Sequence, residues 1–223
     1  VFVVAGRALD DLEKLLEDVT RQRSWLAVRS QANLPVGARF RFVETIPRVV
    51  RSPAEVASRF FSSEHYSAKD DYFFSAISKV TIGNRTGDPR VADAVAIAGL
   101  SAAEKSRRRA VVLLLGSGAT EEGPITAERA RRCLAKLGVP LFVWDVSRAP
   151  AKSDQKSDPG ADVQADAHAH WPEAVRVSGL TSLLGVFRSL EKELASQRIV
   201  WLKGRLNPAK VELTASAGKG VSL

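Results

Sequence analysis

The sequence predicts an α/β fold built on a parallel sheet, and three observations carry that prediction. Residues 110–115 are six apolar residues that run into Gly116, a pattern typical of a strand buried on both faces. A helical pattern over 125–138 follows, and a second apolar strand pattern over 139–147 comes next. Strand, helix and strand in this order indicate neighbouring parallel strands, because a parallel pair needs a crossover connection.

The first half of the chain shows the same alternation of strand and helix patterns. Residues 1–6 are a short apolar run that ends in glycine, and residues 9–22 carry leucines at helical spacing. Turn residues over 34–37 then precede an alternating pattern. The other elements predicted here are strands over 38–45 and 46–52, a helix with a Ser-Pro start over 52–61, a helix in the second half of 62–80 and a helix over 91–108.

The chain is predicted to form one large domain over 1–197 and a short extension over 198–223. Residues 148–172 are polar, small and acidic without periodicity, which predicts a long surface loop inside the domain. A short strand over 174–179 and an amphipathic helix over 181–197 complete the α/β pattern. The extension alternates strand-like pieces with turn residues, so we expect C-terminal β-strands or the start of a further module.

The composition allows a self-supporting core and excludes an intramolecular disulfide framework. The chain has 223 residues, of which 45% are hydrophobic, and Cys133 is its one cysteine. No apolar run reaches the roughly 18 residues of a membrane span, and the first residues lack a signal-peptide pattern. Because Met is absent and Val1 lies in an apparent strand, we expect the natural chain to begin upstream of Val1.

The charge distribution decides which partners we expect. The net charge of +8 would suit nucleic acid, anionic lipid or an acidic protein. The basic residues are scattered, with short clusters at 107–109 and 129–132, and aromatic residues make up just 7% of the chain without interleaving with them. This distribution is typical of a solvated, arginine-rich surface. We therefore expect no nucleic-acid partner.

Five segments carry a resemblance to a known family. They are LPVGARFRFVET, RTGDPRVADAVAIA, RRRAVVLLLGSGATEEG, LGVPLFVWDV and the passage LASQRIVWLKGRLNP after the last predicted helix. Together they resemble a von Willebrand factor type A (VWA) domain of the divergent bacterial subgroup, over about residues 1–200. The resemblance implies a three-layer, Rossmann-like fold with helices on both faces of a mostly parallel sheet, and it is compatible with a secreted or periplasmic location.

The VWA family usually binds a metal ion at the carboxyl ends of its strands, through Asp-x-Ser-x-Ser, a Thr and a further Asp. Such oxygen ligands suit Mg²⁺ in near-octahedral geometry. In this chain Ala5, Arg7 and Leu9 stand at the three positions of the first motif. Pro89 stands near the position of the Thr, and Ser117 replaces the later Asp. The resemblance thus implies a degenerate metal-ion-dependent adhesion site, and we expect no metal and no cofactor.

The replaced ligand positions predict a specific arrangement. We expect Ala5, Arg7, Pro89 and Ser117 to converge at one end of the sheet, with Arg7 bordering the vacated site. A guanidinium there would repel Mg²⁺ and pair with a nearby acid. The candidate acids are Asp88, Glu121 and Glu122. The Glu pair is also expected to favour the positive end of the helix that begins near Thr126, or to bind a basic partner.

Two sharper alternatives remain open on the residues alone. Ser117 between two glycines after a buried strand resembles a hydrolase nucleophile turn, although the Gly-x-Ser-x-Gly pattern is incomplete. His168 and His170 lie in the acidic loop with Asp154, Asp158, Asp162 and Asp166, where a divalent ion would find carboxylates and imidazoles in no specific template. Either would make the chain an α/β hydrolase-type enzyme. A solvated turn and a solvated loop explain the same residues.

The expected function follows from the resemblance and the missing ligands. We expect a non-catalytic protein-protein interaction or scaffold module, with protein partners within a larger complex or a longer chain. Tryptophan supplies large contact areas, so Trp171 at the end of the polar loop and Trp201 in the extension are the expected interface residues, with Glu121 and Glu122 as further candidates. Trp144 in LFVWDV is expected in the core.

Overall fold

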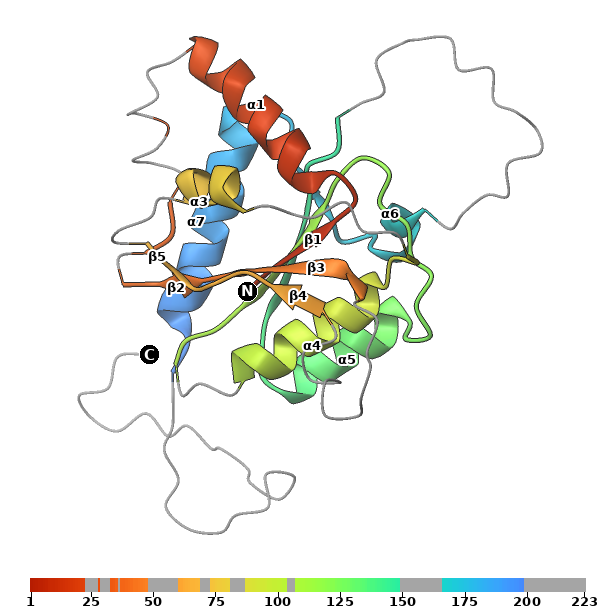
Figure 1. Cartoon of the computed structure of the whole chain (residues 1–223). Coiled ribbons are helices and arrows are strands. Elements are labelled where there is room, and N and C mark those ends of the chain that lie inside the picture. The colour runs from red at the N-terminus through yellow and green to blue at the C-terminus, as the bar shows by residue number, and fades with distance from the viewer. Residues whose placement is uncertain are drawn as a thin grey trace, which may run out of the picture.

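The computed structural model describes residues 1–22, 28, 33–35, 37–47, 60–68, 73–80, 87–103, 107–148 and 166–198. Their centre is a six-stranded sheet in the order β4-β3-β1-β6-β7-β8 (Figure 1). Its strands are β1 (Phe2–Ala5), β3 (Phe42–Pro47), β4 (Phe60–Ser62), β6 (Val111–Leu115), β7 (Leu141–Asp145) and β8 (Val175–Arg176). All neighbouring pairs are parallel except β3 and β4. A separate antiparallel pair joins β2 (Arg39–Phe40) and β5 (Tyr66–Ser67).

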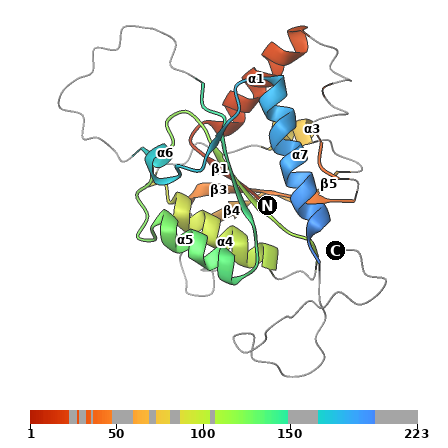
Figure 2. The same ribbon diagram turned by 180° about the vertical axis from the view of Figure 1, so that it is seen from behind.

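Helices cover both faces of the sheet and make three layers (Figures 1 and 2). One face carries α1 (Ala8–Gln22), α3 (Phe73–Lys79) and α7 (Leu180–Ser196), and the other carries α4 (Val91–Ala103) and α5 (Ala127–Lys136). A short helix, α6 (Ala167–His170), precedes β8. The fold class predicted from the sequence, a mostly parallel sheet between helices, is therefore confirmed. Among the helices of the described residues, none combines the length and the apolar character needed to cross a bilayer.

Strand β6 shows why this sheet has two cores. All five of its residues are buried, and successive side chains point to opposite faces. Val112 and Leu114 join the core under α1 and α7, whereas Leu113 and its alternate neighbours join the core under α4 and α5. A strand of this kind must be apolar at every position, which is the pattern that predicted it.

Aromatic rings fill the core under α1, α3 and α7. Phe2 on β1 lies with its ring centroid 4.7 Å from that of Phe73 on α3. Trp144 on β7 lies 5.2 Å from Phe187 on α7 and is 1% exposed, so its predicted place in the core is confirmed. Edge-to-face and tilted contacts of this kind join the helices of this layer to the sheet.

Several predicted elements differ from the structure. The strand expected to begin at residue 46 starts inside β3, which runs from Phe42 to Pro47, and the helix expected over 91–108 is α4, which ends at Ala103. The single strand expected over 38–45 is two strands, β2 and β3, which belong to different sheets. The helix expected over 52–61 is wrong at its end, because Phe60–Ser62 form the edge strand β4 beside β3. Pairing with β3 outweighs the local helical signal there. The C-terminal strands expected from residue 198 onward fall on residues 199–223, which lie outside the described residues.

Candidate functional site

The carboxyl ends of β1 and β6 are the place where a ligand would be expected in this topology. The chain passes from β1 to β3 on one side of β1, whereas β6, β7 and β8 follow on its other side. The switch point of the sheet therefore lies between β1 and β6, and open α/β sheets bind ligands outside the carboxyl ends at such a point. The residues there are Ala5 at the end of β1, Arg7 in the turn after it, and Ser117 in the turn after β6.

These two turns contact each other directly through their backbones. Gly116 N donates to Ala5 O at 3.0 Å, and Arg7 N donates to Ser117 O at 3.0 Å. A Cβ atom on Gly116 would overlap with the backbone of Ala8 and lie 2.6 Å from the carbonyl carbon of Arg7. Gly6, with φ +61°, would place a Cβ 2.7 Å from Ala119 N. Main-chain atoms therefore fill the crevice at the switch point.

A buried carboxylate completes this closure. Asp11 in the first turn of α1 is 5% exposed, and its Oδ2 accepts a hydrogen bond from Ser117 N at 2.6 Å. The acid is thus used to satisfy a main-chain donor at the end of β6. The sequence analysis missed Asp11, although an acid in the first turn of a helix after β1 is a usable signal for a group near the switch point.

The positions that the VWA resemblance matched to metal ligands come together in part. Ala5, Arg7 and Ser117 are joined by the hydrogen bonds above. Pro89 lies at the same end of the sheet, because its carbonyl accepts from Glu122 N and the next residue, Arg90, donates its N–H to Thr45 O on β3. Leu9 differs, since it lies within α1 and packs in the core.

The predicted partner of Arg7 is wrong. Its guanidinium Nε lies 3.3 Å from Asp10 Oδ2, one turn along α1, and both side chains are more than half exposed. The expected pairing with Asp88, Glu121 or Glu122 would need the guanidinium to point along the sheet edge toward α4. A local ion pair within the first turn of α1 replaces it.

Glu121 caps a different helix from the one expected. Its Oε2 accepts from Ala92 N at 2.8 Å in the first turn of α4, and its Oε1 accepts from Gly123 N. Burial raises the pKa of this carboxyl, and the two backbone hydrogen bonds oppose that rise. The α5 helix has its own cap, since Thr126 Oγ1 accepts from Arg129 N, which confirms the predicted helix start.

Several polar side chains beside the switch point line a depression at the end of β7, which has a cavity volume of about 380 Å³. We call this group the β7 cluster, and its members are Asp145, Ser147, Asp166, His168 and Arg176. Ser117, Gly118 and Arg148 line the same depression. The sequence placed Ser117 and His168 in alternative catalytic sites, and the structure brings them to one place.

The contacts of the β7 cluster pair its charges internally. His168 lies between two carboxylates, with Nδ1 2.8 Å from Asp166 Oδ1 and Nε2 3.2 Å from Asp145 Oδ1. Arg176 Nη1 donates to Asp145 Oδ2 at 2.6 Å. Burial alone would raise the pKa of Asp145, but hydrogen bonds from Ser147 and Arg176 outweigh it and lower the pKa below its ordinary 3.8. The backbone N–H of His168 is the first cause of a lowered pKa at Asp166.

This geometry does not assemble a nucleophile on Ser117. Ser117 Oγ accepts from Arg148 N at 3.3 Å, and His168 is engaged by its two carboxylates. His170 contributes its carbonyl oxygen to Arg131 instead. Within the part of the chain that the structure describes, no three His, Cys, Asp or Glu side chains are grouped to hold a metal ion. Asp154, Asp158 and Asp162 lie outside the described residues.

Trp171 is not the surface residue that the sequence suggested. It is 0% exposed and packs in the core under α4 and α5, with the guanidinium of Arg131 5.1 Å from its ring centroid. Residues 148–172 are therefore not a loop throughout, since Ala167–His170 form α6 and anchor this ring. Trp201, the other expected interface residue, lies outside the described residues.

The fold and this edge define a Rossmann-like α/β protein whose switch point is closed by its own main chain. Comparison with known proteins returns no family: no family model matches the chain, and no curated protein matches it significantly.

Proposed function

We propose that the chain is a non-catalytic protein-interaction or scaffold module, a VWA-like domain whose metal-dependent adhesion site has been lost. The observation that carries the proposal is the direct contact between the turns after β1 and β6. A metal site at this position would need oxygen ligands around an open volume. At this position the backbone of Gly116 packs directly against that of Ala8, and the backbone of Gly6 packs directly against that of Ala119.

The charges at this end of the sheet support the same proposal. Asp11 satisfies Ser117 N, Glu121 satisfies Ala92 N, and Asp145 is paired with Arg176. Each of these carboxylates already has a partner in the chain, so each would have to break it to bind a cation. Without a cation to capture a partner's carboxylate, binding has to depend on buried apolar area and preorganised side chains.

The first test is thermal unfolding with added Mg²⁺, Mn²⁺ or Zn²⁺, against a sample in chelator. A metal that binds the native state at a hundred times its Kd adds about 2.7 kcal/mol of stability, which raises Tm by several degrees. We expect no rise. A reproducible rise that disappears in Asp11→Asn would contradict the loss of the metal site.

The second test addresses the interaction itself. We expect a partner that co-purifies with the intact protein from its own cells and stays bound in chelator. Hydrolysis of model ester substrates that is lost in Ser117→Ala or His168→Ala would favour the alternative, an α/β hydrolase-type enzyme. If the partner is released by chelator, the function would be metal-dependent adhesion.

A further inference from the structure

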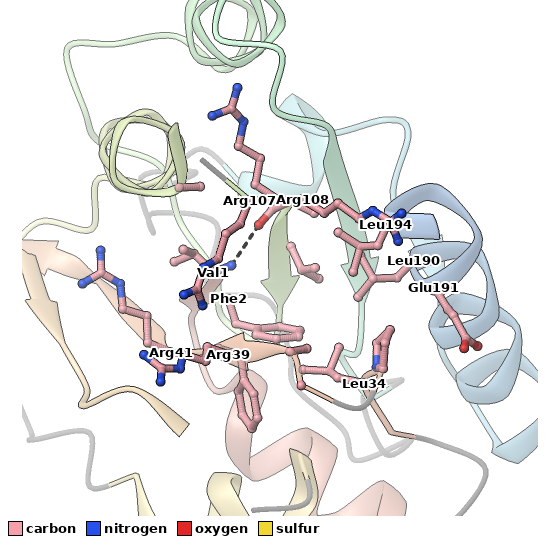
Figure 3. A pocket seen from close by; sticks show the side chains of 18 of the residues that line it. Val1, Phe2, Leu34, Arg39, Arg41, Arg107, Arg108, Leu190, Glu191 and Leu194 are labelled. Carbon is pink, nitrogen blue, oxygen red and sulfur yellow. Dashed lines mark hydrogen bonds between the residues drawn. The ribbon is translucent and has the colours of Figure 1, made fainter. Parts of the chain in front are cut away.

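The amino-terminal end of the sheet carries a pocket of about 890 Å³ (Figure 3). It lies at the opposite end of the strands from the switch point. Its lining comes from the start of β1, the segment around β2, the residues before β6 and the last turns of α7. A volume of this size suits a ligand that buries much of its surface.

One part of this lining is apolar. Phe2 and Phe40 are almost fully buried at its base, and Leu190 and Leu194 of α7 lie on one side. Figure 3 shows the two leucines across the pocket from Arg39 and Arg41. A ligand here would therefore meet aliphatic and aromatic carbon on one side and guanidinium groups on the other.

Four arginines at the pocket have no acidic partner among the described residues. Arg39, Arg41, Arg107 and Arg108 line it, and none of them takes part in an ion pair in that part of the chain. Glu191 is the one acid of the lining. The pocket thus gathers positive charge that the described fold leaves uncompensated.

The neighbouring Arg109, unlike the four pocket arginines, is held by hydrogen bonds within the fold. Its guanidinium donates to Ala103 O and Leu137 O, and its backbone exchanges two hydrogen bonds with the side chain of Gln197. Arg109 therefore ties the end of α7 to the segment before β6. Arg108 and Arg107, one and two residues earlier, are exposed and make no such bonds within the described chain.

We propose that this pocket binds an acidic amphipathic peptide segment of a partner protein. The inference rests on the proposed interaction function and names the chemistry of the partner. The arginines come from two separate segments, 39–41 and 107–108, so one carboxylate cannot engage them all. A peptide that alternates Asp or Glu with apolar residues supplies several carboxylates for the guanidiniums and apolar side chains for the partly exposed Leu194.

Charge complementarity favours this occupant over the chain's own C-terminal segment. Residues 199–223 follow α7 beside the pocket, but they contain Lys203, Arg205, Lys210 and Lys219 against Glu212 alone. A segment with that charge would add to the positive field. Nucleic acid would satisfy the charge, yet the aromatic rings of the lining are buried in the base, where bases cannot stack on them.

The test is selection of peptides from a random displayed library on the immobilised full chain. We expect the selected peptides to be rich in Asp and Glu interleaved with apolar residues. Arg107→Glu with Arg108→Glu should weaken them by at least about tenfold. Arg129→Glu with Arg188→Glu is the matched control, because both residues are exposed outside the pocket and the net charge changes equally. Leu194→Ser should weaken the peptides while leaving the salt dependence unchanged.

Five outcomes would overturn the proposal. Selected peptides that are neutral or basic would do so, as would acidic peptides that bind the charge-reversed pocket as well as the wild type. No enrichment over the charge-reversed variant would do so too. Displacement of the peptides by a short single-stranded DNA would assign the pocket to nucleic acid, and enrichment found only after removal of 199–223 would assign it to that segment. Loss of the partner in chelator, by contrast, would overturn the proposed function and leave the peptide result standing.

Discussion

Gly116 is the residue whose substitution would most directly disrupt the contact between the turns after β1 and β6. A methyl group there would collide with the backbone of Ala8 at the start of α1. Gly116→Ala must separate the two turns and strain the hydrogen bonds between them, so we expect a loss of about 1–3 kcal/mol in the free energy of unfolding. Urea denaturation measures it.

The matched control is Gly185→Ala in α7. Nothing lies within 4 Å of a Cβ at Gly185, and alanine is the better helix former by about 0.5–1 kcal/mol. That variant should therefore be as stable as the wild type or more so. Equal unfolding curves for the two variants would show that the turns after β1 and β6 are not packed as described.

Asp145 tests the internal pairing of the β7 cluster. Its side chain is 15% exposed and accepts from Ser147 and Arg176. Asp145→Asn removes the charge, and because Arg176 is partly solvated we expect a loss of about 1–2 kcal/mol at pH 7. A lowered native pKa means that the stabilisation is present above the ordinary pKa of 3.8 and is lost as pH falls through the native value.

The difference in unfolding free energy between the wild type and Asp145→Asn should therefore narrow as pH falls from 5 to 2, because the native pKa of Asp145 lies below the ordinary 3.8. Urea denaturation at each pH measures this difference. Asp10→Asn is the control, because its ion pair with Arg7 is exposed and contributes little. A constant difference across this range would contradict the role given to the Asp145 carboxylate.

At the scale of elements, the loop after β6 holds α4 through Glu121. The carboxylate accepts from Ala92 N, and burial raises its pKa above the ordinary 4.5. A raised native pKa means that its contribution is fully present below the unfolded value and is lost as pH rises through the native value. Relative to Glu121→Gln, the wild type should lose stability as pH rises from 4.5 toward neutrality.

Thermal unfolding of both proteins over this range gives the measurement. Glu13→Gln, an exposed residue of α1, removes one charge without touching this loop and serves as the control. Parallel stability curves for the wild type and Glu121→Gln would mean that the carboxyl has the same pKa in the folded and unfolded chain.

The segment that begins at Asp166 shows how a polar stretch becomes an ordered element. Ala167 N donates to Ala119 O, and Asp166 forms a bridge with Thr120 in the loop after β6. Trp171 then inserts into the core under α4 and α5. This element carries His168 to the β7 cluster, which explains why a histidine from a polar loop lies beside the end of β7.

At the scale of the whole molecule, the two ends of the sheet differ in kind. The carboxyl ends of the strands are closed by backbone contacts and paired charges, whereas the amino ends open into a pocket with four unpaired arginines among the described residues. Part of the net charge of +8 is therefore concentrated, without acidic partners among the described residues, at the amino ends of the strands. The proposed interaction function belongs to the open end, although the sequence directed attention to the closed one.

The sequence by itself determined the parts of this protein that depend on local pattern. Continuous apolar runs predicted β6, which is buried on both faces, and β7, whose apolar run ends at Asp145. Helical spacing predicted α1, α5 and α7, and the cap at Thr126 was readable from its own few residues. That Ala5, Arg7 and Ser117 do not match the metal-ligand types of the VWA motif was also visible without a structure.

The tertiary structure alone decided what depends on residues far apart in the chain. Asp11 and Ser117 are 106 positions apart, and Glu121 caps a helix that begins 30 positions before it, so no local pattern could pair them. Trp171 follows a polar loop, and its burial became visible once α5 and α6 were placed around it. The arginine pocket joins segments from the start of β1 to the end of α7 that adjoin only after the sheet has formed, because the amino ends of parallel strands meet at one edge whatever their separation in sequence.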